Sequence, residues 1–294
     1  MDINKIIATD PMFRNKEGLV CEPLNGGFSN ETYIVTVQGV KYVVKINFAQ
    51  NEYLNLTRKS ELEAQSRAAA MGIAPKVLSD VEQSAYSISE FIDGHLMEHD
   101  EIMLEDSLVK LAGTMKKIHS ISGIQRTNSA FDLIDGYVKG IDQFQVQVPE
   151  GYRDILIETE KIRNRRSLDR DNNNKYCHND ILGNNLLSDG SRIIVIDWEL
   201  SGLGDPYMDL ASISYSNKFS EEDDKFLLES YFGYYEAEML KNMKDLRYVG
   251  MVREVVWAFF FAGLNRKSVN HDFDYYGAGC YVLDRIKAGH LSLW

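Results

Sequence analysis

The stretch that decides how this 294-residue chain is interpreted reads Cys-His-Asn-Asp-Ile-Leu-Gly-Asn-Asn-Leu-Leu at residues 177–187. A second stretch, Ile-Ile-Val-Ile-Asp-Trp-Glu, follows at residues 193–199. Together they place Asp180 shortly after a histidine, Asn185 a few residues later, and Asp197 at the end of four β-branched residues. Such an apolar run predicts a strand. We therefore expect the three polar side chains to lie close together around a short loop between strands.

This arrangement is the one that phosphoryl transfer from ATP requires. The reaction needs an anion beside the attacking hydroxyl and separate oxygen ligands for a hard cation that bridges the phosphates. Protein kinases supply these groups from a catalytic-loop Asp, an Asn five residues later and a further Asp. Any one of these residues alone is better explained as part of a polar turn or strand end, but their joint occurrence favours a kinase.

Upstream of this stretch, the sequence offers a candidate ATP-phosphate loop. Residues 24–33 read Leu-Asn-Gly-Gly-Phe-Ser-Asn-Glu-Thr-Tyr, which predicts a turn-rich hairpin. Its glycines and small polar residues, Gly26, Gly27, Ser29 and Asn30, would let backbone N–H groups approach phosphates. An ordinary hairpin is the competing interpretation.

A lysine and a glutamate are expected to complete the ATP site. Lys45 lies within the next strand, in Val-Val-Lys-Ile, whereas the competing Lys41 only begins that strand. Residues 55–71 contain many good helix formers and end at a glycine, which predicts a helix. Kinases orient the lysine with a helix glutamate, and we expect Glu61 in that role. Glu63 faces elsewhere on the helix, and a solvated charged face is the alternative for both glutamates.

A domain boundary is expected near residue 94. A predicted strand at residues 85–92 is broken by Asp-Gly. In a kinase this strand leads into a hinge whose backbone binds adenine, so Phe91 and Ile92 are candidate adenine contacts. We predict an ATP-binding domain at residues 1–94 and a catalytic and acceptor-binding domain at residues 95–294.

The second domain is expected to be mainly helical. Apolar residues recur at helical spacing over residues 104–120, and shorter helices are predicted near residues 131–144 and 154–162. Residues 163–175 are rich in charge and asparagine, which predicts a surface loop. The last segment, residues 221–294, predicts further helices with many aromatic side chains.

Composition narrows the class of protein. Hydrophobic residues make up 44% and charged residues 26% of the chain, as in ordinary globular proteins. The net charge of −12 argues against nucleic acid as a partner. No apolar run is long enough for a membrane span, and the three scattered cysteines are typical of a reducing compartment. We expect a cytoplasmic protein. Walker A, zinc-helix and Gly-x-Ser-x-Gly motifs do not occur.

With these motifs the chain resembles the choline/ethanolamine kinase family of the aminoglycoside-phosphotransferase and protein-kinase-like superfamily. The resemblance extends over nearly the whole chain. It rests on Leu24–Asn30, Arg58-x-x-Glu61, Gly72–Pro75, His178-x-Asp180-x-x-x-x-Asn185, Ile196–Ser201, Asp205-Pro206-x-x-Asp209-Leu210-Ala211, Trp257-x-x-Phe260 and Asp272-Phe273-x-Tyr275-Tyr276.

The resemblance implies an α+β, bilobal protein-kinase-like fold with a small β-rich N-lobe and a larger, mainly helical C-lobe. It also implies ATP and Mg²⁺ as cofactors. Asp180 would be the base, Asn185 and Asp197 the metal ligands, and Lys45 with Glu61 would act on the ATP phosphates. Two further residues, His178 and Asp209, are expected to order the catalytic loop without touching substrate.

The resemblance further implies an acceptor pocket for a small cationic alcohol, with Glu199, Trp257, Phe260, Tyr275 and Tyr276 as candidates. A quaternary ammonium has no N–H donor, so it is best held by aromatic ring faces, each contributing about 0.5–2 kcal/mol. The alternative is that these aromatic residues are plain core, and that alternative is preferred for Phe259 and Phe261.

Three positions depart from the family pattern and bear on the acceptor. The family usually has tryptophan where Phe260 stands, a glutamate where Ser216 stands, and a small residue where Asn179 stands. Glu199 or Glu221 would have to replace the missing glutamate. Choline is the expected acceptor; ethanolamine, thiamine, an aminoglycoside or a methylthio-sugar are alternatives. A nucleotide-binding pseudokinase is the alternative from a different class.

Overall fold

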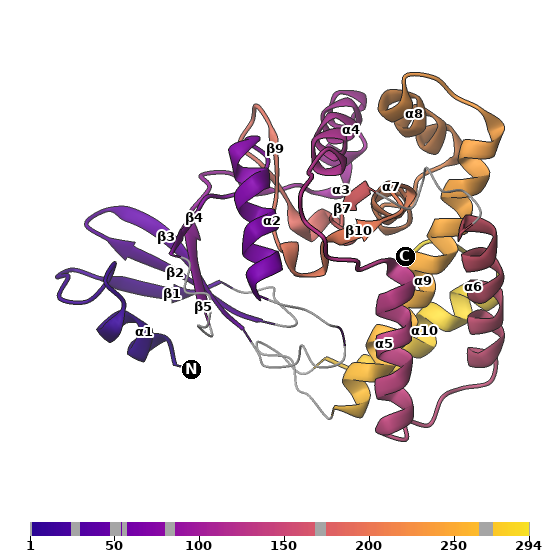
Figure 1. Cartoon of the computed structure of the whole chain (residues 1–294), viewed down its shortest axis with the longest axis horizontal. Helices are drawn as coiled ribbons and strands as arrows, with labels where there is room; N and C mark the ends of the chain where they lie inside the picture. The colour runs from indigo at the N-terminus through magenta and orange to yellow at the C-terminus, as the bar shows by residue number, and fades with distance from the viewer. Residues whose placement is uncertain are drawn as a thin grey trace.

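The computed structural model describes residues 2–24, 30–47, 54, 58–79, 86–167, 175–264 and 273–293. Its N-terminal part is built on one antiparallel sheet with the strand order β1-β2-β3-β5-β4 (Figure 1). The strands are β1 (Val20–Pro23), β2 (Asn30–Val37), β3 (Val40–Asn47), β4 (Val77–Ser79) and β5 (Tyr86–Glu90). Antiparallel pairing with short connections follows from the period-two pattern of β2 and β3.

The register of the β2–β3 hairpin is fixed by its turn. Gln38 and Gly39 both have positive φ angles, 51° and 81°, which suits the right-handed twist of a two-residue hairpin. Alternate side chains then reach one face of the sheet, where Val35, Val44 and others are buried. Helix α1 (Ile3–Thr9), which the sequence analysis did not predict, adds its apolar side chains to this small core.

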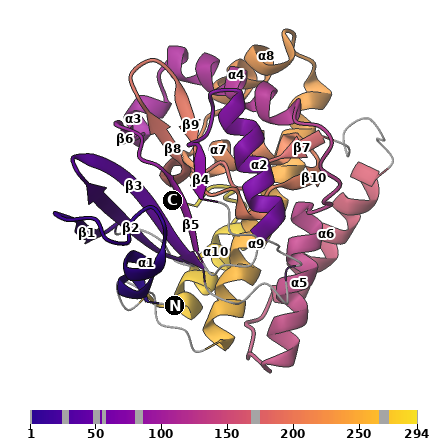
Figure 2. The same ribbon diagram turned by 60° about the vertical axis from the view of Figure 1, so that its left-hand side comes forward.

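Helix α2 (Arg58–Ala70) lies between the sheet and the helical part of the molecule (Figures 1 and 2). Ala64 and Ala68 are fully buried and belong to the larger core of the C-terminal part. Their small side chains allow close packing, which brings α2 against the residues around Trp198. The helix thereby holds Glu61 near the junction between the two parts.

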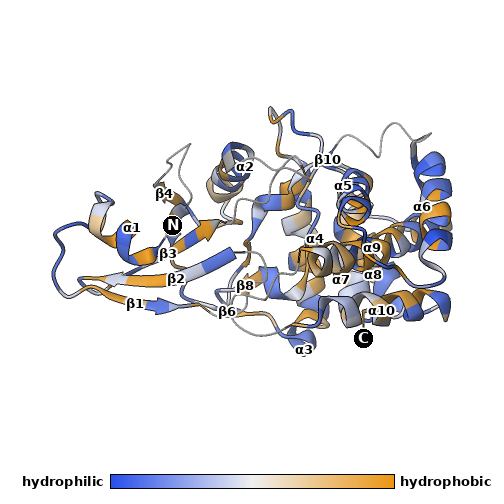
Figure 3. Cartoon of the chain, turned by 90° about the horizontal axis from the view of Figure 1, so that it is seen from below, coloured by the Kyte–Doolittle hydropathy of each residue, from blue (hydrophilic) through white to orange (hydrophobic). Residues whose placement is uncertain are grey.

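The C-terminal part is organised around helix α9 (Ala237–Gly263), which packs against α5, α7 and α10. Figure 3 shows that the central helices are mainly hydrophobic. The other helices are α3 (His99–Ile102), α4 (Glu105–His119), α5 (Ala130–Gln143), α6 (Tyr152–Ser167), α7 (Tyr207–Ser216), α8 (Glu221–Phe232) and α10 (Tyr275–Lys287). Among the described helices none is both long and apolar enough to cross a membrane.

Two small sheets carry the segment that the motifs identified. Strand β8 (Leu186–Ser188) pairs with β6 (His95–Leu96) and β9 (Ile193–Val195), and β7 (Lys175–Cys177) pairs with β10 (Gly202–Gly204). The chain between β7 and β8 includes the 3₁₀ turn η1 (Gly183–Asn185), and the turn η2 (Trp198–Leu200) follows β9. The polar motif residues therefore lie on connections between short strands, as expected.

The predicted surface loop at residues 163–175 is wrong at its beginning, because α6 continues to Ser167. The charged side chains that suggested a loop have tertiary partners. Arg166 is 3% exposed and pairs with Asp205, with Nη2 2.7 Å from Oδ2. Arg163 donates to Asp135 at 2.6 Å. Such contacts override local composition and support another turn of helix. The domain boundary near residue 94 stays a prediction.

Candidate active site

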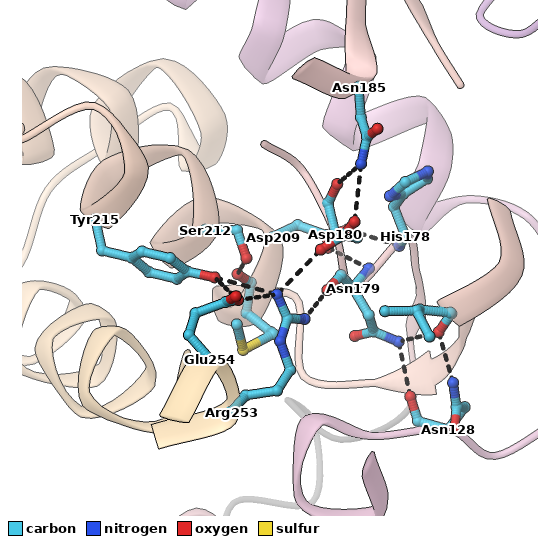
Figure 4. Close-up of polar contacts among 12 residues, drawn as sticks. Asn128, His178, Asn179, Asp180, Asn185, Asp209, Ser212, Tyr215, Arg253 and Glu254 are labelled. Atoms are coloured by element: carbon cyan, nitrogen blue, oxygen red, sulfur yellow. Dashed lines mark hydrogen bonds and ion pairs between the residues drawn. The ribbon is translucent and has the colours of Figure 1, made fainter. Parts of the chain in front are cut away.

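Asp180 lies between β7 and η1 with both carboxylate oxygens in contact with other side chains (Figure 4). Asn185 donates its side-chain N–H group to Asp180 Oδ2 at 2.8 Å and to the Asp180 carbonyl at 2.9 Å. On the other side, Arg253 of α9 donates to Asp180 Oδ1 at 3.1 Å. The Asp180 side chain is still 21% exposed, so a hydroxyl group can reach it.

The backbone conformation before Asp180 explains the unusual residue between the histidine and the acid. Asn179 has a φ of 65°, in the left-handed region that asparagine tolerates better than most residues. Its side-chain N–H group donates to the Asn128 carbonyl at 2.7 Å and the Leu200 carbonyl at 3.1 Å. Asn179 therefore anchors the loop to two other segments.

Asp209 organises the same loop from the first turn of α7. Its carboxylate accepts the backbone N–H groups of His178 at 2.9 Å and Asn179 at 2.7 Å. His119 contacts the same carboxylate at 3.0 Å. Burial alone would raise the pKa of Asp209, but the side-chain hydrogen bond with His119 and the backbone hydrogen bond from His178 help to lower it below its usual value. These contacts are those of a residue that orders the loop.

His178 is fully buried and connects the loop to the strand that ends at Asp197. Its Nε2 lies 3.1 Å from the Ile196 carbonyl, and its ring packs edge-on against Trp198 at 4.8 Å. Burial lowers the pKa of His178, although neighbouring carboxylates act in the opposite direction. The neutral imidazole thus serves as a packed, hydrogen-bonded support.

Lys45 brings β3, α2 and the end of β9 together. Its Nζ lies 3.0 Å from Glu61 Oε1, 2.6 Å from Asp197 Oδ1 and 3.6 Å from Glu199 Oε2. Burial would lower the pKa of Lys45, but these carboxylates raise it, so the ammonium stays charged. Asp197 has a φ of 64°, which turns its side chain out of the strand direction.

The competing residues of the sequence analysis lie elsewhere. Lys41 is exposed and its ammonium sits 4.9 Å from the centre of the Phe91 ring. Glu63 pairs at the surface with Arg67, 2.9 Å away. The geometry therefore selects Lys45 and Glu61 from the two candidate pairs.

The rest of the expected nucleotide site is described in part. Asn30 begins β2 and donates to Glu199 Oε2 at 3.0 Å, which ties the sheet to the catalytic segment. Gly26, Gly27 and Ser29 lie outside the described residues. The two candidate adenine contacts, Phe91 and Ile92, follow β5 and are half-buried.

The expected aromatic pocket is only partly assembled. Trp257 is half-buried on α9, and its ring lies 5.5 Å from Tyr275, 5.3 Å from Phe261 and 6.5 Å from Phe273. Trp257 follows Arg253, which contacts Asp180, by one helical turn on the same face of α9.

The other two aromatic candidates make most of their contacts outside this cluster, although Phe260 also packs edge-on against Phe261, with ring centres 5.4 Å apart. Phe260 is 1% exposed and packs against Tyr137 and Phe144, with ring centres 5.3 and 5.8 Å away. Tyr276 donates its hydroxyl to the Gln147 carbonyl at 2.9 Å and packs beside another ring of the core. Tyr275 contacts the Trp257 ring but is itself 3% exposed, so Trp257 is the more accessible of the two.

The sequence analysis missed the group of side chains behind Asp180: Arg253, Glu254 and Tyr215. Arg253 and Glu254 interrupt an apolar run of α9, Met-Val-Arg-Glu-Val-Val, and Arg253 is 3% exposed. A charged pair inside a buried helix segment needs partners, which is the signal that could have found it. Which partners it has could not be read from the sequence.

Comparisons with known proteins show the family to which similar chains belong. A sequence model described as the phosphotransferase enzyme family matches residues 20–246. Protein LicA of Haemophilus influenzae is 24% identical over 255 residues, which cover 79% of this chain and 70% of that protein. "Probable ethanolamine kinase A" of Dictyostelium discoideum is 25% identical over 310 residues, covering 94% and 87% respectively.

Solved structures confirm the expected kinase-like fold. A choline/ethanolamine kinase family protein from Mesorhizobium loti superposes with a TM-score of 0.76 at 24% identity, covering 97% of this chain and 92% of that one. Choline kinase LicA from Streptococcus pneumoniae gives 0.77 at 20% identity, covering 96% and 99%. A LicA structure in complex with AMP gives 0.72 at 21% identity, covering 96% of each chain.

Proposed function

Because this chain belongs to the phosphotransferase enzyme family, we propose that it transfers the γ-phosphoryl group of ATP to a small cationic alcohol, with choline as the preferred acceptor. The observation that carries the proposal is the convergence of Lys45, Glu61 and Asp197, with Asp180 and Asn185 on the adjoining loop. A kinase-like site needs these groups in these relative places.

In the proposed mechanism Asp180 accepts the proton of the acceptor hydroxyl as that oxygen attacks the γ-phosphorus. The side-chain N–H group of Asn185 holds one oxygen of this carboxylate, which leaves the carboxylate's remaining lone pairs for the hydroxyl. Lys45, kept in place by Glu61, binds the phosphates of ATP as a fixed positive charge while the bond between the γ-phosphorus and the ADP oxygen breaks.

The donor atoms around Lys45 fit a magnesium ion. Carboxylate and amide oxygens are the ligands that Mg²⁺ prefers, and Asn185, Asp197 and Glu199 offer them on adjoining segments. Three carboxylates, those of Glu61, Asp197 and Glu199, lie within 3.6 Å of the Lys45 ammonium, and such a concentration of carboxylate oxygens suits a divalent cation. When bound, the ion supplies charge neutralisation of the phosphates.

The acceptor pocket is proposed at Trp257 and Tyr275. The aromatic face of the half-buried Trp257 suits a quaternary ammonium, and its position one helical turn beyond Arg253 is compatible with a short alcohol whose hydroxyl reaches Asp180. Glu221 does not replace the glutamate that the family has at Ser216. It pairs with Lys225 and Lys244 on the surface of α8, at 3.0 and 2.9 Å.

The cellular location is proposed from the cysteines. Cys21, Cys177 and Cys280 are all free, which fits a reducing compartment where ATP is abundant. We place the enzyme in the cytoplasm.

The experiment that tests the proposed function is ADP formation from ATP and Mg²⁺ with a panel of acceptors. The panel contains choline, ethanolamine, thiamine, an aminoglycoside and a methylthio-sugar. We expect choline to give the largest kcat/KM. A larger kcat/KM for ethanolamine would show that ethanolamine, not choline, is the preferred acceptor. If no member of the panel stimulated ADP formation, the assignment to small cationic alcohols would be overturned.

A further inference from the structure

Behind Asp180 lies an arginine to which the proposed mechanism gives no role. Arg253 comes from the middle of α9, and its side chain is 3% exposed. One guanidinium nitrogen, Nη1, donates to the Asn179 carbonyl, and the other, Nη2, donates to Asp180 Oδ1 at 3.1 Å (Figure 4). The guanidinium thus binds the backbone and the side chain of consecutive residues in the loop.

The same guanidinium is itself held from the far side. Nη2 also lies 3.1 Å from the Tyr215 hydroxyl and 3.0 Å from Glu254 Oε1. The Tyr215 hydroxyl donates to Glu254 Oε1 at 3.2 Å, which closes a small network. Because Tyr215 comes from α7 and Glu254 from α9, two helices fix the direction in which Arg253 points. The planar guanidinium group of arginine can donate hydrogen bonds in several directions at once.

The contacts of the Asp180 carboxylate show what this network does. Asn185 holds Oδ2 at 2.8 Å and Arg253 holds Oδ1 at 3.1 Å. The terminal torsion of an aspartate is broad, so one hydrogen bond leaves the carboxylate free to rotate. Two contacts on opposite oxygens remove that freedom. The carboxylate is therefore held in one orientation before any acceptor arrives.

We propose that Arg253 is a positioning residue for phosphoryl transfer, which fixes the orientation of the Asp180 carboxylate and is itself fixed by Glu254 and Tyr215. This inference rests on the proposed role of Asp180 as the base. Proton acceptance in the transition state depends on close alignment, and a misplacement of about 1 Å can cost roughly 100-fold in rate. Arg253 also lies one turn before Trp257 on α9, so the helix that carries the proposed acceptor pocket also aligns the base.

A second arginine on α9 provides a matched control. Arg247 donates to the buried Asp224 carboxylate at 2.7 Å and to the Leu291 carbonyl. It resembles Arg253 in residue type, helix and carboxylate partner, but its contacts are with α8 and the C-terminal segment. Arg247→Met therefore reports the cost of removing a largely buried α9 arginine without touching the catalytic loop.

The test compares Arg253→Met, Arg253→Lys and Arg247→Met in kcat, KM for ATP, ADP binding and melting temperature. We expect Arg253→Met to lower kcat about 100-fold, with ADP affinity and KM for ATP within threefold of wild type. Arg253→Lys keeps the charge but cannot make all the contacts, so we expect an intermediate loss of about 10-fold. Arg247→Met should lower the melting temperature and leave kcat unchanged.

A kcat for Arg253→Met within threefold of that for Arg247→Met would overturn the inference, because the arginine would then serve only helix packing. Should Arg253→Met fail to fold, Arg253→Lys decides alone, and a wild-type kcat for it overturns the inference. ADP formation from ATP in the absence of any acceptor is measured in the same three variants, with water as the nucleophile. Failure of every alcohol on the panel therefore rejects the proposed acceptor class while Arg253 is still tested.

Discussion

Asp180 is held between two side chains that reach it from very different parts of the chain. Asn185 is five residues away, whereas Arg253 is 73 residues away. Since each contacts a different carboxylate oxygen, the acid is oriented while its side chain remains 21% exposed. A base that is both oriented and accessible is what removal of a proton from an acceptor hydroxyl requires.

Replacing this acid should separate chemistry from nucleotide binding. We expect Asp180→Ala to lower kcat at least about 100-fold, because general base catalysis contributes about 10² to 10⁴ in rate. ATP affinity should change little, since Lys45, Glu61 and Asp197 make the expected phosphate and metal contacts without Asp180. Steady-state turnover and equilibrium ATP binding measure the two quantities. Near-full turnover in the variant would show that Asp180 is not the base.

The pH dependence of activity should also report Asp180. The pKa of its carboxyl is raised to about 7: burial is the main cause, Arg253 acts in the opposite direction, and Glu254, Asp197 and Glu199 act in the same direction as burial. The base works only when deprotonated. We therefore expect kcat/KM for the acceptor to fall as the pH drops below about 7, approaching tenfold per pH unit.

A matched variant gives the sign of this effect. Glu254→Gln removes a negative charge that raises the pKa of Asp180, so the midpoint of the profile should move to lower pH. The measurement is kcat/KM for the acceptor as a function of pH, in the wild type and in Glu254→Gln. A profile that is flat between pH 6 and 8 in the wild type, or a midpoint that moves upward in the variant, would contradict this assignment.

At the scale of single elements, α9 carries both the proposed pocket and the arginine behind the base. Trp257→Ala should raise KM for choline at least about 10-fold, because a desolvated cation–π contact contributes about 2 kcal/mol. KM for ATP should stay within twofold. Tyr276→Phe is the control, since Tyr276 bonds to the Gln147 carbonyl away from the Trp257 cluster. If the two variants changed KM for choline equally, Trp257 would not be a residue of the acceptor pocket.

The N-terminal helix is tied to the sheet by a buried hydrogen bond. Tyr86 on β5 donates to Asp10 Oδ2 at 2.7 Å, and Asp10 is only 2% exposed. Tyr86→Phe leaves that carboxylate without this donor, so we expect a loss of about 1–3 kcal/mol in the free energy of unfolding. Urea denaturation measures it. Tyr33→Phe, which loses a more accessible contact to Glu31 at 3.1 Å, should cost less. A larger cost for Tyr33→Phe would contradict this reasoning.

At the scale of the whole molecule, the described residues of the sheet and of the helical part meet at the catalytic segment. Lys45 reaches Asp197, and Asn30 reaches Glu199, across more than 150 residues of chain. The metal and phosphate groups proposed for this junction would contact both parts. Substrate binding is therefore expected to stiffen the connection between them.

Those features of the fold that depend on a local sequence pattern could be predicted from the sequence. The helices at α2 and α4 were predictable from helix-forming residues and apolar periodicity, and the α+β fold class was implied by the resemblance to a known family. The choice of Lys45 over Lys41 followed from its place within a strand. The end of α6 was mispredicted because Arg166 gains a buried partner, Asp205, that no local pattern reveals.

In the candidate site, too, local sequence patterns did not reveal the tertiary partners. The motif identified Asp180, but its contact with Arg253 depends on how α9 packs beside the loop, and the sequence carries no spacing rule for that contact. The aromatic candidates were chosen by resemblance, and the packing of α9 turns Phe260 toward Tyr137 rather than toward Trp257. Long-range packing decides such details.

The most direct test of the central claim is identification of the product by ³¹P NMR after incubation with ATP, Mg²⁺ and choline. We predict that the γ-phosphate signal is replaced by that of phosphocholine in equal amount to the ADP formed, and that Asp180→Ala forms none. Release of the same phosphate as inorganic phosphate, with no phosphocholine, would contradict it.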